Sequence, residues 1–406
     1  MDLVSFYECV LQLPKPWHVK RVECFQEAGR VDVWLEHEHV MFRCPKCMCE
    51  CPIQDHLPER VWRHLDTCGY QTFLHANLPR IKCATDGKRT AWIPFATPQT
   101  SVSEAMERKC IETMRECSMI GAENLTGVSV RRLERIRAIA VERGLKRRDE
   151  SELAKIGIDE KQVFSRHRYF TILTDQVHRR VYDVVDSRKL EKIRPWFDEN
   201  AHLIRHVETV AMDMSAGYAS IAAERMPDAA ICYDRFHVVQ VVNLAVDATR
   251  KDEQRSMSTE KRKAMFGNRF CFLYAKENMP DKQRERFEEV ARVATKTARA
   301  WRIKEMLRDM LAMTPMDFEA AFPKWYWWAT HSRLKHIAKV AKTLKSHYHG
   351  LMNAIEFGIT NALAEGLNSK IESVKRMACG YKNKAHFRIA ILFHCGKLDM
   401  LPNLVM

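Results

Sequence analysis

The chain contains no long apolar segment and no export signal at its N-terminus. No run of about eighteen apolar residues, the length that spans a membrane, occurs in its 406 residues. Residues 1–13 lack a basic stretch followed by an apolar run and a small-residue cleavage site. Internal repeats and low-complexity tracts are also absent. We therefore expect a soluble, cytoplasmic protein with no membrane partner, and neither a collagenous nor a disordered one.

The cysteines do not indicate a disulfide framework. Without a route to an oxidising compartment, the 14 cysteines are expected to be free thiols or metal ligands. Eight of them lie at or before Cys83, and this clustering favours a metal. Cys44-Pro45-Lys46-Cys47 is a half-site for Zn²⁺, because a gap of two residues lets both thiolates reach one tetrahedral ion.

The charge balance points to a polyanionic partner. The formal net charge is +14 and the isoelectric point about 9.2. Each phosphate that a basic protein neutralises releases condensed counterions, so nucleic acid is the favoured partner. A basic protein with an evenly spread surface charge remains the alternative. The length of 406 residues indicates two to four domains.

The first two segments are expected to bind DNA. Residues 1–100 are rich in Cys, His and Pro, and the alternation in 31–36 predicts a half-buried strand. Residues 101–150 have a helical pattern, with Ser103 as a cap and a second helix opening near Ala122. A turn containing Gly127 then leads to a third basic helix, which is the order of a helix-turn-helix. The residues expected to contact DNA are Arg131, Arg132 and Arg135.

Residues 151–240 predict an α/β core. Strands are expected at 155–160, 169–175 and 180–185, joined by links short enough for an antiparallel meander. A helix at 190–204, a strand at 206–213, a helix at 216–225 and a strand at 229–234 follow. This order is that of an RNase H-like fold. Residues 241–350 are almost all helical, and 351–406 return to the core with a basic C-terminal part.

Three carboxylates are candidates for a catalytic site. Asp159 lies in the first of these strands, Asp213 at the end of the fourth, and Glu365 on a late helix. The first and fourth strands of an RNase H-like sheet are neighbours, so the two aspartates would converge. Three such groups can hold two divalent ions roughly 3.5–4 Å apart, and Mg²⁺ (or Mn²⁺) suits oxygen ligands. An Asp at a strand end is otherwise a turn or cap residue. Asp175 also ends a strand, but at the edge away from Asp213.

Several motifs in fixed order resemble one known family. They are residues 157–160, 212–218, 234–239, 360–371 and 375–383. Together they resemble the DDE transposases of the ISL-three insertion-sequence family, over about residues 44–387. The resemblance implies a zinc-ribbon-like element, a helix-turn-helix and an RNase H-like catalytic core with an all-helical insertion. It implies the triad Asp159, Asp213 and Glu365, and cleavage and strand transfer of double-stranded DNA at terminal inverted repeats and in target DNA. A homodimer is expected because two element ends must be held.

Residues beside the triad are expected to support it. Asp234 and His237 form an Asp-x-x-His pair on or after the fifth strand. The alternatives are that they contact the scissile phosphate, support the metal shell or fix that turn, and we expect a supporting role rather than direct metal ligation. Asn361 and Asn368 share a helix face with Glu365, where they would orient DNA or metal-bound water. Glu372, on the same face, is more simply a partner for Lys or Arg.

The zinc site departs from the family pattern. The resemblance predicts a second Cys-x-x-Cys pair, but this chain has Cys83-Ala84-Thr85-Asp86. Asp86 is the expected fourth ligand, since carboxylate zinc ligands occur. The alternatives are that Cys49, Cys51, Cys68 or a nearby His replaces it, or that the ribbon has lost its metal.

Two further segments have more than one interpretation. Seven Lys/Arg and one Glu lie between Lys370 and Lys397. We expect Lys370, Lys375, Arg376 and Lys382 to hold the DNA backbone near the cut. The aromatic run 325–328 is expected in the core or in a helix or dimer contact, and stacking on an unpaired base is the alternative.

Two other functions compete with the transposase. A catalytically inactive, transposase-derived, sequence-specific DNA-binding protein would be expected to have lost one of the three acids, and all are present. A zinc enzyme using the N-terminal cysteines is less consistent, because sites of this spacing are usually structural and closed.

Overall fold

The computed structural model describes residues 2–38, 41–97, 99–149, 153–164, 168–359 and 362–402. The chain divides into two compact units, Met1–Asp149 with Ser373–Met406, and Glu150–Glu372. The boundary between Glu372 and Ser373 falls inside one helix, α14 (Ala362–Met377). Within the described ranges, no helix combines the length and the apolar character needed to cross a membrane.

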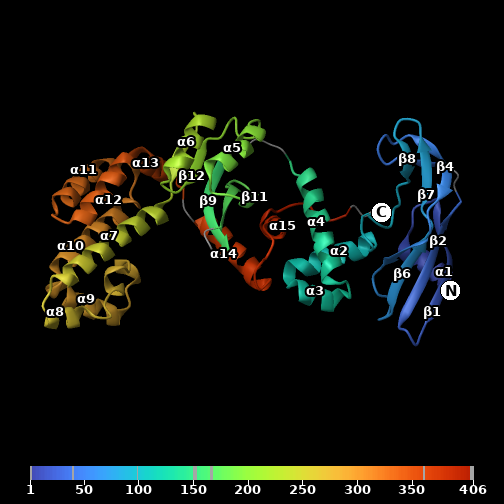
Figure 1. Ribbon diagram of the computed structural model, residues 1–406, viewed down its shortest axis with the longest axis horizontal. Coiled ribbons are helices and arrows are strands. Elements are labelled where there is room, and N and C mark those ends of the chain that lie inside the picture. Colours follow the sequence, from blue (N-terminus) through green and yellow to red (C-terminus); the bar gives the residue numbers. More distant parts are fainter. Residues whose placement is uncertain are drawn as a thin grey trace. The chain divides into compact units, whose positions relative to one another are not determined.

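The first unit begins with two β-sheets and continues with helices (Figure 1). Its elements are α1 (Leu3–Leu11), β1 (Trp17–Phe25), β2 (Arg30–His37), β3 (Met41–Arg43), β4 (Glu50–His56), β5 (Arg60–Arg63), β6 (Gln71–Ala76), β7 (Pro79–Cys83), β8 (Gly87–Thr90), α2 (Glu104–Glu116), α3 (Met119–Thr126), α4 (Val130–Lys146) and α15 (Lys384–Cys395). The sheets have the orders β1-β2-β6-β5 and β3-β4-β7-β8.

The strand predicted at 31–36 is confirmed as part of β2. Val31, Val33 and Leu35 face the core. Asp32 is also buried, against the alternation, because His75 and Arg30 hold its carboxylate at 2.9 and 2.8 Å.

The helices predicted after residue 100 are confirmed, with one shifted start. The Ser103 hydroxyl accepts the N–H of Met106 and caps α2. The next helix, α3, begins at Met119 rather than near Ala122, because Ser118 caps it through the N–H of Gly121. Gly127 ends α3 with φ at +66°, a backbone conformation that glycine adopts without strain.

The second unit joins a five-stranded sheet to a helical region (Figure 1). Its elements are β9 (Lys155–Phe164), β10 (Arg168–Asp175), β11 (Arg180–Val185), α5 (Leu190–Glu199), β12 (Thr209–Met212), α6 (Ala216–Arg225), β13 (Ala230–Tyr233), α7 (Arg235–Arg255), α8 (Thr259–Met265), η1 (Phe270–Phe272), η2 (Lys276–Asn278), α9 (Asp281–Val293), α10 (Thr295–Met310), α11 (Pro315–His331), α12 (Lys335–Ser346), α13 (Tyr348–Glu356) and α14 (Ala362–Met377).

The sheet has the order β11-β10-β9-β12-β13. The first three strands form the predicted antiparallel meander, and β12 runs parallel to both β9 and β13. The fourth strand is shorter than predicted, because its ladder with β9 begins only at Thr209, opposite Lys155. The predicted helix from Leu190 ends at Glu199, five residues early, and Leu203 and Ile204 are buried in the turn that follows.

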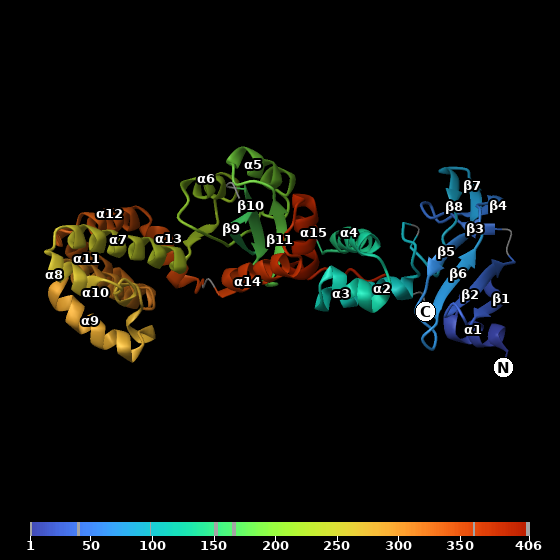
Figure 2. The same cartoon turned by 60° about the horizontal axis from the view of Figure 1, so that its bottom comes forward.

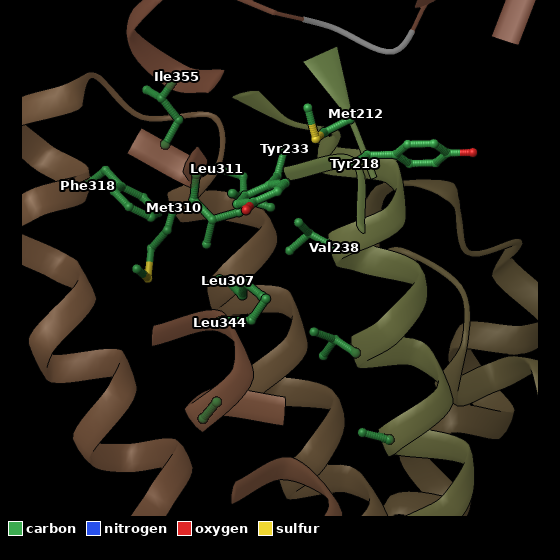
Figure 3. Packing of buried hydrophobic residues seen from close by; sticks show 14 of the residues in the cluster. Met212, Tyr218, Tyr233, Val238, Leu307, Met310, Leu311, Phe318, Leu344 and Ile355 are labelled. Carbon is green, nitrogen blue, oxygen red and sulfur yellow. The ribbon is translucent and has the colours of Figure 1, made fainter. Parts of the chain in front are cut away.

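One hydrophobic core continues from this sheet into the helices. Figure 3 shows Val238, Leu307, Phe318 and Leu344 pointing toward a common interior beside Tyr233 of β13. Gly350 of α13 allows this close approach, since a Cβ there would lie 2.3 Å from the Tyr233 ring. The helices are therefore packed against the strand that leads to Asp234.

Candidate functional site

The register of β9 and β12 brings two of the predicted carboxylates together. Met212 pairs with Ile158 in a parallel ladder, so the next residues on each strand, Asp213 and Asp159, lie side by side. Asp159 lies within β9, and Asp213 follows the last residue of β12. Both are half-buried. They line one hollow together with Asp234, His237 and Asn368.

Asp213 is held in an electrostatically crowded position. Burial raises the pKa of its carboxyl, the charge of His237 and the N–H of Ser215 lower it, and the negative charge of Asp159 raises it again. The net direction is upward. A cation bound nearby would stabilise the charged form of this carboxylate, because it offsets both the lost hydration and the repulsion between like charges.

Asp234 shares that environment. It follows β13 and caps α7, where its carboxylate accepts the N–H of Phe236 at 2.9 Å. Burial is the main cause that raises its pKa, and the charges of Asp159 and Glu365 contribute in the same direction. The His237 ring nitrogen lies 3.9 Å from the carboxylate. Asp234 therefore has a local structural partner and also interacts with the other acids.

The late helix contributes an amide and an acid. The side-chain amide of Asn368 donates to the Asp159 carboxylate at 2.6 Å. Lys161 fixes the same helix to β9, donating to the Asn368 carbonyl at 3.2 Å and pairing with Glu372 at 3.5 Å. Two views show α14 running beside the sheet (Figures 1 and 2). Glu372 thus has the partner expected for it.

Glu365 lies one helical turn before Asn368 on α14. Its side chain is exposed, and it is not among the residues that line the hollow. Its charge nevertheless acts on Asp234. Asn361 lies outside the described residues.

The carboxylate of Asp175, the other strand-end aspartate considered for the site, is bound by residues of the turn and strand that follow it. It is 1% exposed and accepts the backbone N–H groups of Val177 and His178, each at 3.1 Å. The His178 ring and the Arg180 guanidinium lie at 2.7 and 2.9 Å from the carboxylate. Asp175 therefore stabilises the turn between β10 and β11.

Sequence reasoning missed several neighbours of the site. Glu160 lies beside Asp159 in sequence, and burial together with Asp213 and Asp159 raises its pKa, although a hydrogen bond with Tyr218 opposes this. Gly157 lines the hollow and has no room for a side chain, since a Cβ would lie 2.3 Å from Thr174 Oγ1. The Gly-Ile-Asp-Glu motif was the available sequence signal for both residues. Which side chains pack around this motif depends on tertiary structure, and the sequence does not reveal that.

The N-terminal cysteines form a second cluster. Cys44 and Cys47 follow β3, Cys83 ends β7, and Asp86 directly precedes β8. One ligand atom from each of the four lies within 4.8 Å of all the others. Among the described residues, this is the one group of His, Cys, Asp or Glu side chains close enough together to hold a metal ion. It includes neither Cys49, Cys51 nor Cys68.

The separations in this cluster fit a tetrahedral ion. Bonds of about 2.3 Å to zinc place neighbouring thiolates roughly 3.8 Å apart. The Cys47 and Cys83 sulfurs are 3.4 Å apart, and the Asp86 carboxylate lies 3.5 Å from Cys44 Sγ and 3.8 Å from Cys83 Sγ. The backbone N–H of Asp86 lowers the pKa of Cys83 to about 7, which favours its thiolate.

The basic residues predicted to contact DNA fall in two places. Exposed on α4 are Arg131, Arg132 and Arg135, and Arg132 and Arg135 line a groove with Arg60. Lys370 is exposed on the part of α14 that belongs to the second unit. Lys375, Arg376 and Lys382 belong to the first unit.

Residues 377–383 line a groove with residues of α3 and α4. Tyr381, within this segment, stacks on Phe387 of α15 at 4.7 Å. This conspicuous sequence motif therefore connects α14 to the helices of the first unit rather than lining the carboxylate hollow.

A family model described as a transposase, of the DDE and ISL3 (ISL-three) type, matches residues 156–391. The chain belongs to this transposase family. A second model, the zinc finger of the transposases of IS204, IS1001, IS1096 and IS1165, matches residues 41–86 of this transposase, including all four residues of the Cys–Asp cluster.

Relatives of this transposase come from other insertion sequences. It is 26% identical to the transposase for insertion sequence element IS1557 of Mycobacterium tuberculosis, over 89% of this chain and 88% of that one. It is 23% identical to the transposase for IS1001 of Bordetella parapertussis, over 92% and 94%. Among solved structures it is similar to the Drosophila P element transposase strand transfer complex, with a TM-score of 0.37, 8% identity, and coverage of 74% of this chain and 93% of that chain.

Proposed function

We propose that the carboxylate hollow is the catalytic site of a DNA transposase that cuts the ends of its own element and joins them to target DNA. The observation that carries this proposal is the convergence of Asp159, Asp213 and Asp234 in one hollow, close enough to Glu365 for its charge to act on Asp234. Like-charged groups in such proximity repel one another unless cations are bound.

The donor set fits Mg²⁺ or Mn²⁺, which prefer oxygen ligands. Asp159, Asp213 and Glu365 would hold the ions, which when bound activate the attacking hydroxyl and stabilise the leaving oxygen. Asn368 fixes one carboxylate oxygen of Asp159 and leaves the other free to bind. Asp234 and His237 keep the turn after β13 in place beside Asp213. Hydrolysis and strand transfer are both in-line displacements, so one site serves both.

The strand order supports an RNase H-like core. An antiparallel meander followed by two parallel strands, with α5 and α6 in the connections, is the order expected for that fold. The helical region from α7 to α13 would be the insertion between the fifth strand and the helix of Glu365. We assign residues 151–240 and 351–372 to the core and 241–350 to the insertion; the rest of the segment predicted for the core, Ser373–Met406, groups with the first unit instead.

End recognition is assigned to the first unit. In residues 101–150, α3 and α4 flank the Gly127 turn as a helix-turn-helix would, with Arg131, Arg132 and Arg135 exposed for phosphates and base edges. The groove containing Arg60, Arg132 and Arg135 is a suitable place for a phosphate. Lys375, Arg376 and Lys382 extend this basic surface, while Lys370 stays with the catalytic unit. A homodimer would hold the two terminal inverted repeats.

Residues 1–100 would be a zinc-ribbon-like DNA-binding domain in which Cys44, Cys47, Cys83 and Asp86 bind Zn²⁺. Replacing Asp86 with Ala should lower the zinc content of the purified protein, and Asp86→Cys should retain or raise it. Metal analysis of the two variants checks this, and equal zinc in Asp86→Ala and wild type would contradict the assignment.

The function is tested with a duplex carrying DNA that borders the gene, incubated with Mg²⁺ or Mn²⁺. Wild type is expected to cut it, whereas Asp159→Asn, Asp213→Asn and Glu365→Gln are expected to bind without cutting. Cutting by all three variants would remove the catalytic assignment. If the wild type binds the duplex without cutting it, the proposal that this protein is an enzyme would be contradicted.

A further inference from the structure

The helical region carries one segment whose charge has a single sign. Between Glu319 and Glu356 the sequence contains six Lys or Arg, four His and no Asp or Glu. Elsewhere in the same region, α9 has four acidic and four basic residues. Solvated helix faces usually mix the two signs. The segment, which forms most of α11, all of α12 and most of α13, therefore differs from a generic solvated surface.

Two lysines of α12 lie on its exposed face and have no acidic partner among the described residues. Ile337, Ala341 and Leu344 are buried, so this face of the helix packs on the core. Lys339 and Lys342 lie on the opposite, exposed face. Within the described ranges neither forms an ion pair, in contrast to Lys335, which pairs with an aspartate of α7 at 2.8 Å.

The neighbouring helix exposes an aromatic ring. The predicted core role holds for Trp325, which is 1% exposed and donates its indole N–H to the Ile303 carbonyl at 2.9 Å. Trp327 differs, because it is 63% exposed and stacks on His331 at 4.6 Å with an angle of 18° between the rings. A large exposed ring held in a fixed orientation is a common feature of nucleic-acid-binding surfaces.

A contact between the helices joins the two features. The Lys345 ammonium of α12 lies 4.7 Å from the centre of the Tyr326 ring on α11. Tyr326 directly precedes Trp327 on α11, so this contact places α12 beside the part of α11 that carries the exposed ring.

We propose that this surface, Lys339 and Lys342 with Trp327, is a second DNA-binding surface of the transposase. The two lysines neutralise phosphates, and Trp327 stacks on an unpaired base. The proposal rests on the proposed function, since it adds a contact to the same DNA. It also gives the helical region a role in binding beyond connecting β13 to α14.

The test measures DNA binding by the full-length chain, with Asp213→Asn in every protein so that the DNA stays intact. The probes are a blunt random-sequence duplex and the same duplex with an unpaired overhang. Lys339→Gln/Lys342→Gln is compared with Lys282→Gln/Arg286→Gln, which removes two exposed charges from α9. Thermal unfolding of each variant verifies that it is folded.

Removal of Lys339 and Lys342 should reduce the slope of log K against log salt by about 1.8, at about 0.9 per phosphate contact. The α9 pair should leave the slope unchanged. Trp327→Ala should weaken binding to the overhang probe about tenfold and hardly affect the blunt probe.

Equal slopes for the α12 and α9 variants would overturn the lysine contacts. An unchanged affinity of Trp327→Ala for the overhang probe would overturn the stacking contact. Failure of the parent protein to bind any duplex would instead overturn the proposed function, and this surface with it.

Discussion

Two aspartates at strand ends of the same sheet have opposite surroundings. Asp175 ends β10 and Asp213 follows β12. The Asp175 carboxylate is buried, which alone would raise its pKa, but hydrogen bonds from His178 and the charge of Arg180 outweigh this and hold the pKa below its usual range. Asp213 accepts one N–H from Ser215, but burial raises its pKa and the negative charge of Asp159 adds to that rise.

The difference shows how a structural carboxylate is distinguished from a catalytic one. A carboxylate whose lone pairs are occupied by fixed donors stabilises a turn and has little capacity left for a ligand. A carboxylate crowded by like charge is destabilised until a cation binds, which is the state expected of a metal site. The same residue type at comparable positions in one sheet therefore has two functions, determined by its partners.

Exchanging the carboxylate for an amide at each position should separate the two roles most strongly in DNA cleavage. Asp213→Asn should reduce cleavage by a factor on the order of 10³ or more, because a lost metal ligand removes several kcal/mol of transition-state stabilisation. Asp175→Asn should cut at close to the wild-type rate wherever it remains folded. Cleavage of an end duplex by the two purified variants is the measurement, and equal activities would contradict the distinction.

In stability the order of the two variants should be reversed. Asp175→Asn should lower the free energy of unfolding by about 3 kcal/mol, because it breaks a buried charged network and leaves Arg180 without its partner. Asp213→Asn should leave the metal-free protein as stable as wild type or stabilise it by about 1 kcal/mol, since it removes a repelled charge. Urea unfolding without divalent cations measures both values. A larger loss for Asp213→Asn would contradict this prediction.

A smaller effect is expected for the amide that positions Asp159. Asn368→Ala should weaken Mn²⁺ binding by about tenfold, the lower range for removing a residue that orients a metal ligand. Glu372→Gln, on the same helix, is the control, because it loses only a partly exposed ion pair with Lys161. Isothermal titration with Mn²⁺ compares them. If both variants bind as the wild type does, Asn368 has no positioning role.

The weakest predicted effect is on the acid side of the stability profile. The pKa of Asp175 is lower in the folded chain than in the unfolded one, so its contribution is complete above the unfolded pKa, roughly 3.9, and is lost as the pH falls toward the folded value. Asp175→Asn should therefore lose less stability than wild type below about pH 4. Unfolding experiments across this range measure the slope, and identical slopes would exclude the effect.

The sequence was sufficient for the local elements and for part of the site. Periodicity and Ser103 predicted the strands and α2, and the order of elements placed Asp159 next to Asp213 before the register was known. The start of β12 was wrong because it depends on where its ladder with β9 begins. Periodicity also gives no sign that His178 and Arg180 would occupy Asp175.

Long-range contacts could not be predicted from the sequence, because they too depend on tertiary packing. The hydrogen bond from Asn368 to Asp159 joins residues 209 positions apart. Helix periodicity showed only that Asn368 shares a face with Glu365, and the partner of that face depends on how α14 packs. The grouping of residues 373–406 with the first unit likewise depends on tertiary packing and has no local signal.

The central claim is that the hollow around Asp159 and Asp213 binds divalent cations, and Mn²⁺ binding tests it most directly. The signal of free Mn²⁺ in electron paramagnetic resonance is titrated with wild type, Asp175→Asn and Asp213→Asn. We expect wild type and Asp175→Asn to take up Mn²⁺ with the same affinity, and Asp213→Asn to bind it at least about tenfold more weakly. Equal uptake by wild type and Asp213→Asn, or none by the wild type, would contradict it.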